Sequence, residues 1–322
     1  MIDVVYLGES LSTLASISRK LTVDETIIVD IWSDGSLLSG IRVSNLEVDK
    51  IPMLVRESIT TDNTVYFKPD TIYIGSETTY DSKVSMGVEL QRNWFQELSQ
   101  GGIIPRKFFC SIYRSLKSLV GVKRNYDVIS TIKLRDKELK LLRYGVLHYG
   151  TLVNTLPLPY FINKTDLPSD IKEGLTSKLD YVGLLINIAL TRCNIDNYTV
   201  VYVGKKNLIP HTIVVIPLRY FMKELTNYTI VYSIASIRRP YINFKGEYVN
   251  RLLLDVNKLG MFNVELISYK VIHEKYGLLG RVDEDLEYYL GSLKDIGVVL
   301  KGRLGIWREL SIKELLDSNN VV

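Results

Sequence analysis

The sequence predicts an α/β fold in which one domain is built around a parallel β-sheet. Two short apolar runs, residues 4–7 and 26–29, have the composition of strands that are buried on both faces of such a sheet. Between them lies Gly8, followed by a segment whose apolar residues recur at helical spacing from Leu11 to Leu21. A strand, a glycine turn, a helix and a second strand form the first half of a Rossmann-like dinucleotide-binding unit.

The turn after the first strand carries the expected nucleotide contacts. In such units the N-terminus of the helix binds the pyrophosphate, and a carboxylate at the end of the second strand bonds the adenosine ribose. Asp30 ends the second strand and lies 22 residues after Gly8, close to the usual spacing of about 20. The expected contacts are Gly8, Ser10, Leu11 and Ser12 at the turn, with Asp30 and Ile31 at the strand end.

The glycine pattern of this turn, G-x-G-x-x-G, is incomplete. Ser10 and Thr13 stand at its second and third glycine positions. Ser10 is a mild replacement, whereas Thr13 is expected to force the helix and strand apart or to shift the helix, because the third glycine permits their close packing. Glu9 places a negative charge beside the expected pyrophosphate, which opposes binding.

Composition limits the class of protein. At 322 residues the chain has the length of about two domains, and its 46% hydrophobic and 24% charged residues are typical of a globular protein. No apolar stretch approaches the roughly 20 residues of a transmembrane helix, and the start of the chain lacks the features of a signal peptide. Two cysteines, Cys110 and Cys193, fit a reducing cytoplasm. We therefore expect a cytoplasmic protein with no membrane partner.

The net charge of +4 is too small to indicate a nucleic-acid partner. Its distribution is uneven, since no Asp or Glu lies between Leu98 and Tyr126. The basic residues of that interval are Arg106, Lys107, Arg114, Lys117, Lys123 and Arg124. This basic stretch, residues 106–124, is either the solvated face of a helix or a surface for an anionic ligand or a partner protein.

The remaining chain predicts further strands. Residues 126–133 and 138–146 predict a small antiparallel meander, and residues 66–119 are expected to be mostly helical after Val84. Other predicted strands are 181–189, 198–204, 212–218, 229–236, 251–256 and 264–271. No catalytic residue is identified, because the three histidines lack metal-ligand spacing and no nucleophile elbow occurs.

Three segments carry a family resemblance. They are residues 31–40, residues 149–159, which end in Asn-Thr-Leu-Pro-Leu-Pro, and residues 300–312, which contain Gly-Arg-Leu-Gly-Ile-Trp. In this order they resemble segments of the superfamily of FAD-dependent amine oxidases, UDP-galactopyranose mutases and protoporphyrinogen-oxidase-like proteins. The resemblance implies an FAD cofactor with further contacts from Gly40, Thr155, Pro157, Gly302, Arg303 and Ser311. Glu309 departs from the family pattern.

The resemblance also implies a domain organisation, namely a Rossmann-like FAD/NAD(P)-binding domain interleaved with a smaller mixed-sheet substrate-like domain. The first would comprise residues 1–65, 120–165 and 295–322, and the second residues 66–119 and 166–294.

The implied function is that of an FAD-binding oxidoreductase or a UDP-galactopyranose-mutase-like enzyme acting on a small molecule or a nucleotide sugar. One alternative is a degenerate, cofactor-free member that serves as a binding or scaffold subunit. Glu9, Thr13, Glu309 and a chain shorter than typical members favour that alternative. A third interpretation, an NAD-dependent enzyme with one Rossmann domain, leaves the C-terminal segment unexplained.

Overall fold

The computed structural model of the chain describes residues 2–19, 25–31, 37–56, 63–192, 195–238, 246–260 and 265–317. The chain divides into two compact units that alternate along the sequence. Unit 1 comprises residues 1–39, 112–180 and 279–322, and unit 2 comprises residues 40–111 and 181–278. Each unit is described below by itself.

The boundaries of the units differ from those expected. Residues 40–65 lie in unit 2, whereas residues 112–119, 166–180 and 279–294 lie in unit 1. The expected boundaries followed the motifs, and apart from Gly40 these four segments contain none of the motif residues. Unit 2 is also slightly the longer of the two rather than the smaller.

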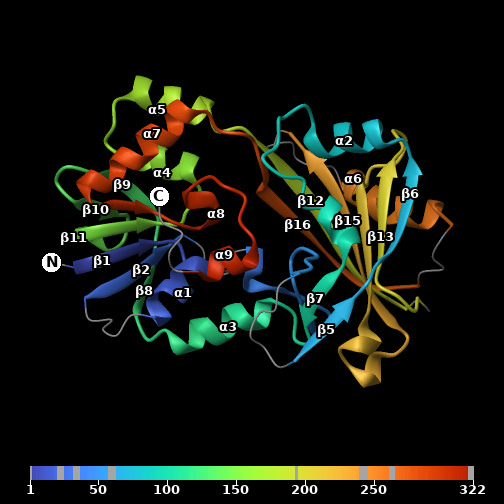
Figure 1. The fold of residues 1–322 in the computed structure, drawn as a ribbon. Coiled ribbons are helices and arrows are strands. Elements are labelled where there is room, and N and C mark those ends of the chain that lie inside the picture. The colour runs from blue at the N-terminus through green and yellow to red at the C-terminus, as the bar shows by residue number, and fades with distance from the viewer. Residues whose placement is uncertain are drawn as a thin grey trace. The chain divides into compact units, whose positions relative to one another are not determined.

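A seven-stranded sheet, counted over the described residues, forms the centre of unit 1 (Figure 1). Its strands are β1 (Ile2–Leu7), β2 (Thr26–Asp30), β8 (Lys123–Tyr126), β9 (Ile129–Lys133), β10 (Glu138–Leu141), β11 (Gly145–Asn154) and β17 (Val298–Leu300). They follow the order β8-β2-β1-β11-β10-β9, with β17 also beside β11. Strands β8, β2, β1, β11 and β17 are parallel, and β9 and β10 form the antiparallel meander with β11. The α/β prediction is thereby confirmed.

Helices cover both faces of this sheet. They are α1 (Leu11–Ser18), α3 (Cys110–Leu119), α4 (Leu158–Lys164), α5 (Ser169–Ser177), α7 (Glu284–Ser292), α8 (Gly302–Gly305) and α9 (Ile312–Leu316). Figure 1 shows α1 and α3 on one side of the sheet and α4, α5 and α7 on the other. The predicted helix after Gly8 ends at Ser18, and the last part of its expected span, residues 20–21, lies outside the described residues.

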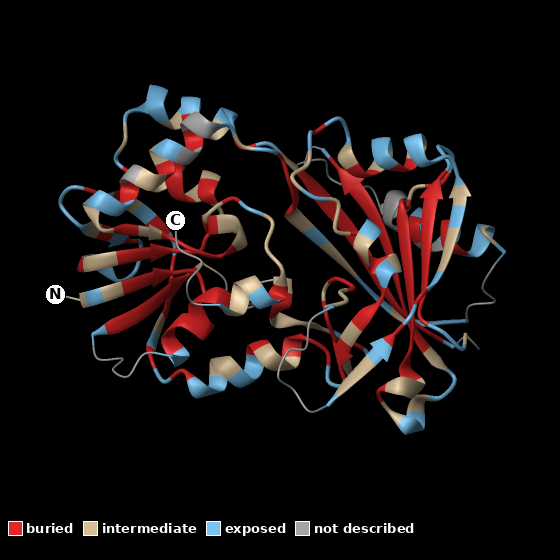
Figure 2. Cartoon of the chain, in the orientation of Figure 1, coloured by how far each residue is buried: buried red, intermediate tan, exposed pale blue. Residues whose placement is uncertain are grey.

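A mixed six-stranded sheet forms the centre of the described part of unit 2, in the order β16-β12-β15-β14-β13-β6. These strands are β6 (Asp70–Gly75), β12 (Tyr181–Arg192), β13 (Thr199–Gly204), β14 (Thr212–Pro217), β15 (Tyr228–Ile237) and β16 (Glu265–Leu279). Helices α2 (Glu77–Ser85) and α6 (Gly246–Lys258) pack on it, and two small ribbons pair β3 (Ile41–Val43) with β4 (Leu46–Val48) and β5 (Thr64–Phe67) with β7 (Gly102–Pro105). The inner strands are buried on both faces (Figure 2).

Two predicted segments of unit 2 are wrong. Residues 251–256 belong to helix α6, because Leu252 and Val256, four residues apart, both pack against the sheet. Residues 84–119 are not mostly helical, since they include β7 and irregular chain besides α3 and a 3₁₀ helix at Gln96–Gln100. Other 3₁₀ helices lie at Leu37–Ser39, Leu218–Tyr220, Lys223–Leu225 and Leu293–Ile296.

Candidate functional site

The turn between β1 and α1 requires glycine at its first position. Gly8 has a φ of +95°, and its N–H donates to the carbonyl of Val29 at 2.8 Å. A Cβ at Gly8 would lie 2.7 Å from the hydroxyl of Thr155, so a side chain there is excluded twice, by conformation and by space. Ser10 caps α1, because its hydroxyl accepts the N–H of Thr13 at 3.1 Å.

Thr13 ties the helix to the turn instead of pushing it away. Its hydroxyl donates to the carbonyl of Gly8 at 2.7 Å and lies 3.1 Å from the hydroxyl of Thr155. Thr155 in turn donates to the carbonyl of Leu7 at 2.9 Å. Thr13 is fully buried within these contacts, so its hydroxyl links the helix to the turn and to Thr155. Hydrogen bonds occupy the place where close glycine packing is usual.

Glu9 is neutralised and held away from solvent. Its carboxylate is fully buried and receives Lys117 Nζ at 2.5 Å, the guanidinium of Arg124, and the hydroxyl of Tyr126 at 3.2 Å. Lys117 lies on α3, whereas Arg124 and Tyr126 lie on β8. Two cations therefore compensate the negative charge that the sequence places beside the turn, which weakens the reason to expect that Glu9 opposes pyrophosphate binding.

The backbone of Glu9 is fixed as well. Its N–H donates to Asp30 Oδ2 at 2.6 Å, and its carbonyl accepts the hydroxyl of Tyr113 at 3.0 Å. Burial, with the Glu9 charge nearby, raises the pKa of Tyr113 well above its usual value of 10, so this hydroxyl remains a donor. Burial alone would lower the pKa of Lys117, but its contacts with Glu9 outweigh that effect and raise it. The turn is thus held by β2, α3 and β8.

The basic stretch is partly explained by this clamp. Lys117 and Arg124 bind Glu9 in unit 1, and Arg106 in unit 2 donates to the carbonyl of Tyr220 at 3.1 Å. These three side chains serve internal contacts of their own units. A partner surface at residues 106–124 would rest on the other basic residues.

Asp30 lies at the carboxyl end of β2, as predicted. Besides the N–H of Glu9, its carboxylate accepts the N–H of Ile31 at 2.6 Å. Two backbone donors therefore orient it at the strand end where a dinucleotide site has its ribose acid. Of the resembling segment 31–40, residues 32–36 lie outside the described residues.

The C-terminal segment reaches the same turn within unit 1. Strand β17 pairs with the end of β11, and Gly302 follows with a φ of +71°. A Cβ at Gly302 would lie 3.4 Å from the Ser12 hydroxyl oxygen and 3.6 Å from Thr155 Cβ. Three segments that are distant in the sequence therefore meet at the first turn of α1. Of the expected contacts, Gly8, Ser12, Thr155 and Gly302 are brought together directly.

Polar groups at this meeting point lack partners in the described part of unit 1. Neither the N–H of Leu11 nor that of Ser12 has an acceptor there, as is usual for the first turn of a helix. Asn154, at the end of β11, is fully buried and its Oδ1 has no hydrogen-bond partner there. Unpaired N–H groups at a helix N-terminus suit the pyrophosphate of a dinucleotide, so these residues fit such a group. Asn154 was not among the expected contacts. It lies inside the resembling segment 149–159, but in the sequence it is simply the last residue of a strand, and nothing there marks it as a binding residue.

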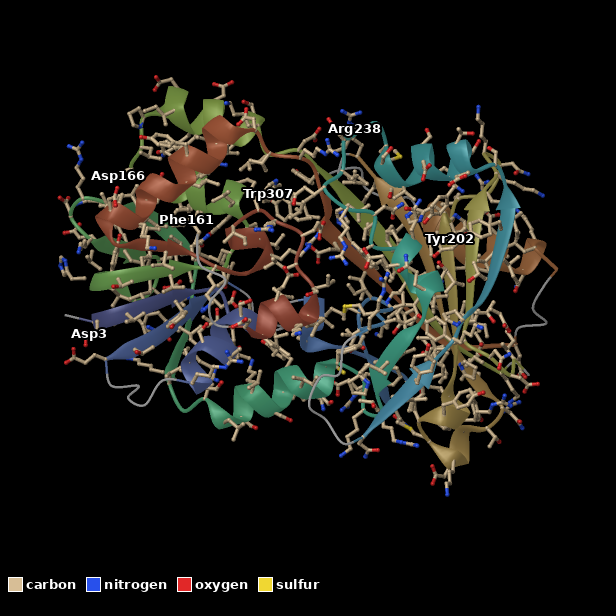
Figure 3. The ribbon with its side chains drawn as sticks, in the orientation of Figure 1. Asp3, Phe161, Asp166, Tyr202, Arg238 and Trp307 are labelled. Atoms are coloured by element: carbon tan, nitrogen blue, oxygen red, sulfur yellow. The ribbon has the colours of Figure 1, made fainter. Side chains whose placement is uncertain are left out.

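Arg303 and Ser311 have internal partners. The guanidinium of Arg303 binds Glu309 at 2.7 and 2.8 Å, and Glu309 also accepts the N–H of Leu279 at 2.9 Å. Glu309, the departure from the family pattern, thus orients Arg303. Ser311 caps α9 through a reciprocal pair of bonds with Glu314. Between them Trp307 is buried with a φ of +53° (Figure 3).

Two further expected contacts have structural roles of their own. Pro157 precedes α4 and its carbonyl accepts the N–H of Phe161 at 3.0 Å, so it begins a helix of unit 1. Gly40 belongs to unit 2, where its φ is +80° and a Cβ would lie 2.6 Å from Cys110 Cβ. Gly40 therefore allows a close approach inside unit 2.

Among the described residues, no group of three or more His, Cys, Asp or Glu side chains could hold a metal ion. His148 is exposed on β11 opposite Glu138. His211 is buried in unit 2 between Thr212, at 2.8 Å from Nδ1, and Ser236, at 3.2 Å from Nε2. Burial lowers the pKa of His211 to about 3, so it is neutral. The sequence identifies no catalytic residue, and the described part of the structure does not identify one either.

Comparison with known proteins defines the fold. No family model and no curated protein matches the sequence. A reduced UDP-galactopyranose mutase matches the structure with a TM-score of 0.78 at 10% identity, covering 96% of this chain and 91% of that one. A protein from Exiguobacterium sp. 255-15, described as a protoporphyrinogen oxidase, matches with a TM-score of 0.71 at 10% identity over 98% and 96% of the two chains.

A fatty acid isomerase from P. acnes also matches, with a TM-score of 0.65 at 10% identity over 97% and 96% of the chains. This protein therefore shares the fold of these three structures, whose kinds include two that the three segments resemble. The matches cover nearly all of both chains in each pair. Within the described residues, no helix is long and apolar enough to cross a bilayer.

Proposed function

We propose that unit 1 binds FAD and that the protein is a flavin-dependent oxidoreductase or mutase. The observation that carries this proposal is the convergence of Gly8, Thr155 and Gly302 on the first turn of α1. The fold likeness supports it, since the similar structures include a reduced mutase and an oxidoreductase from Methanosarcina mazei. One argument for a cofactor-free member weakens, because the charge of Glu9 is compensated within unit 1.

Different residues of unit 1 would bind different parts of FAD. The N–H groups of Leu11 and Ser12 would bind the pyrophosphate, and Asp30 would bind the ribose. Gly8 and Gly302 would keep the space beside α1 free of side chains, while Ser10, Ile31, Thr155, Pro157, Arg303 and Ser311 would surround it. Bound flavin supplies redox chemistry, and the protein supplies orientation and electrostatics. A small molecule or a nucleotide sugar would be the substrate.

Absorbance of the purified protein tests the proposal. Flavin bands, present as purified or after incubation with FAD and removal of the excess, are expected. A protein that stays colourless with excess FAD contradicts the proposal. Binding of NAD in place of FAD, followed by calorimetry, would instead support the single-Rossmann interpretation.

Asp30→Asn tests the placement of the ribose. FAD affinity should fall about 10- to 100-fold, because a hydrogen bond to a charged group contributes about 1.5–3 kcal/mol. Asp127→Asn is the matched control, since Asp127 is a buried carboxylate of unit 1 that accepts the N–H groups of Arg143 and Tyr144. The control should leave FAD affinity unchanged. Equal affinities of all three proteins would place the ribose elsewhere.

A further inference from the structure

A chain of hydrogen-bonded side chains runs through the core of unit 2, from helix α2 to the sheet and back. The hydroxyl of Tyr80, on α2, lies 3.3 Å from the hydroxyl of Thr212 on β14. That hydroxyl lies 2.8 Å from His211 Nδ1, and Nε2 lies 3.2 Å from the hydroxyl of Ser236 on β15. Ser236 donates at 2.8 Å to the carbonyl of Val84, again on α2. All five residues are buried.

One end of this chain can only accept a proton. Val84 lies in the last turn of α2, where carbonyls lack N–H partners from their own helix, and no backbone N–H of the described residues reaches its oxygen. Because a carbonyl carries no proton, Ser236 gives its single hydroxyl proton to it. The oxygen of Ser236 is then the acceptor towards His211, so the proton of the imidazole is on Nε2.

The other end can only donate. The side chain of Asn93 forms a hydrogen bond with Tyr80, and Asn93 Oδ1 is buried with no hydrogen-bond partner among the described residues. That bond therefore comes from the amide nitrogen, which is a donor only. Tyr80 accepts it and gives its own proton to Thr212, whose proton in turn goes to Nδ1 of His211. Both ends thus fix the same direction.

The imidazole between them is neutral and held in place. Burial lowers the pKa of His211 to about 3, so one ring nitrogen carries a proton and the other accepts one near neutral pH. Its backbone N–H donates to the carbonyl of Ile234 at 2.9 Å, and its carbonyl accepts the N–H of Val203 at 2.8 Å. The rings of Phe95 and Tyr80 meet the imidazole edge to face, with centroids 4.9 and 6.2 Å away.

The opposite direction leaves a buried group unpaired. With the proton on Nδ1, Thr212 would donate to Tyr80, and the proton of Tyr80 would need the Oδ1 of Asn93 after the amide had turned. Ser236 would then donate to Nε2, and the carbonyl of Val84 would lose its donor. A buried carbonyl without a donor destabilises a fold. The unpaired oxygen of Asn93 nevertheless gives the reversed chain an acceptor at its end, so a second direction exists.

We propose that these side chains form a two-state relay that latches the C-terminal end of α2 to the sheet, with His211 held as the Nε2–H tautomer. Loss of the Ser236 hydroxyl removes the acceptor of the Nε2 proton. The relay then reverses, and His211 becomes the Nδ1–H tautomer. This inference concerns unit 2 alone and is independent of the cofactor of unit 1.

Nitrogen NMR of the full-length protein with ¹⁵N-labelled histidine tests the relay, because protonated and unprotonated ring nitrogens resonate far apart. The signals of His211 are those that disappear in His211→Asn. In the wild type the proton should be on Nε2. Ser236→Ala should move it to Nδ1, and hydrogen exchange in the last turn of α2 should accelerate about tenfold, because the Val84 carbonyl loses its partner.

Ser233→Ala is the matched control. Ser233 is a buried serine of the same strand whose hydroxyl donates at 3.1 Å to the carbonyl of Leu252 on another helix, α6. This variant should change neither the tautomer nor the exchange of α2. Thr212→Val leaves the bonds of Ser236 in place, so it should keep the Nε2–H tautomer.

Three results overturn the proposal. The first is an Nδ1–H tautomer in the wild type, which needs no variant to fold. The second is an Nδ1–H tautomer in Thr212→Val, where Nδ1 has lost the hydroxyl beside it. The third is a folded Ser236→Ala protein that keeps the proton on Nε2.

Discussion

Single residues at the turn show how far a local pattern can mislead. Glu9 and Thr13 break the glycine pattern, and from the sequence both seem to oppose nucleotide binding. In the structure Thr13 bonds the turn, and Glu9 receives two cations that are 108 and 115 residues away. A motif describes residues that are neighbours in the sequence. The electrostatic effect of Glu9 on the turn depends instead on Lys117 and Arg124, which are its neighbours in space. The sequence does contain one indication of this contact. No acidic residue lies between Leu98 and Tyr126, so a basic residue of that interval that forms an ion pair must do so with a carboxylate outside it.

Removing the Glu9 carboxylate should destabilise unit 1. In Glu9→Ala, Lys117 and Arg124 lose a shared, fully buried counter-charge, which should cost about 2–4 kcal/mol because their own side chains remain partly hydrated. Glu9→Gln should cost less, since the amide oxygen still accepts a hydrogen bond. Chemical denaturation measures both changes.

The control for this clamp is Glu138→Ala, which removes a partly exposed ion pair with Lys133. Its loss of stability should be much smaller than that of Glu9→Ala. Equal losses for the two variants would contradict a special role for the buried carboxylate.

At the scale of elements, long or strongly patterned segments are predictable and short apolar runs are not. Strands β1, β2, β12, β13, β14 and β15 lie where their β-rich or apolar runs predict. The run at residues 251–256 fails, because a short apolar stretch fits a strand and a helix equally well. Its assignment is decided by Leu252 and Val256, which pack on the sheet with helical spacing.

The connection between β13 and β14 offers a test at this scale. Lys83 of α2 donates to the carbonyls of Val203, Lys205, Leu208 and Pro210 at 2.6–3.2 Å. Lys83→Met removes the donor that these four carbonyls share, which should cost about 2–3 kcal/mol. Hydrogen exchange should also accelerate in this connection.

Lys206→Met is the matched control, since Lys206 is exposed on the same connection. It should change neither stability nor exchange. If Lys83→Met behaves like this control, the four bonds do not stabilise the connection.

At the scale of the whole molecule, the order of the motifs predicts two interleaved parts but not their limits. Apart from Gly40, segments 40–65, 112–119, 166–180 and 279–294 carry no motif residue, so their membership depends on packing that the sequence does not display. The meeting of Ser12, Thr155 and Gly302 is predictable in outline, because parallel strands place their carboxyl ends at one edge of a sheet.

Global stability should depend on His211 in acid. Its pKa is lowered to about 3 in the folded protein, whereas it is near 6.5 in the unfolded chain. Between these values the unfolded state binds the additional proton, so the free energy of unfolding falls as the pH is lowered, by up to about 1.4 kcal/mol per pH unit. Acid should therefore unfold the protein partly by protonating this residue.

The comparison with His211→Asn isolates this effect. Burial raises the pKa of Asp49 to about 6, and this opposite contribution stabilises the fold as the pH falls below that value. It cancels when the two proteins are compared. The difference in stability between wild type and variant should shrink from pH 7 to pH 4, and parallel curves would rule out the role of His211.

The interleaving has a consequence for synthesis on the ribosome. Strand β1 emerges first, but its neighbour β11 ends at Asn154 and β17 ends at Leu300. The sheet of unit 1 is therefore complete only when nearly the whole chain has been made. Until then β11 lacks its neighbour β17, and pairing between such distant segments is slow. We expect such a nascent chain to bind chaperones, because the last strand of unit 1 is made after all of unit 2.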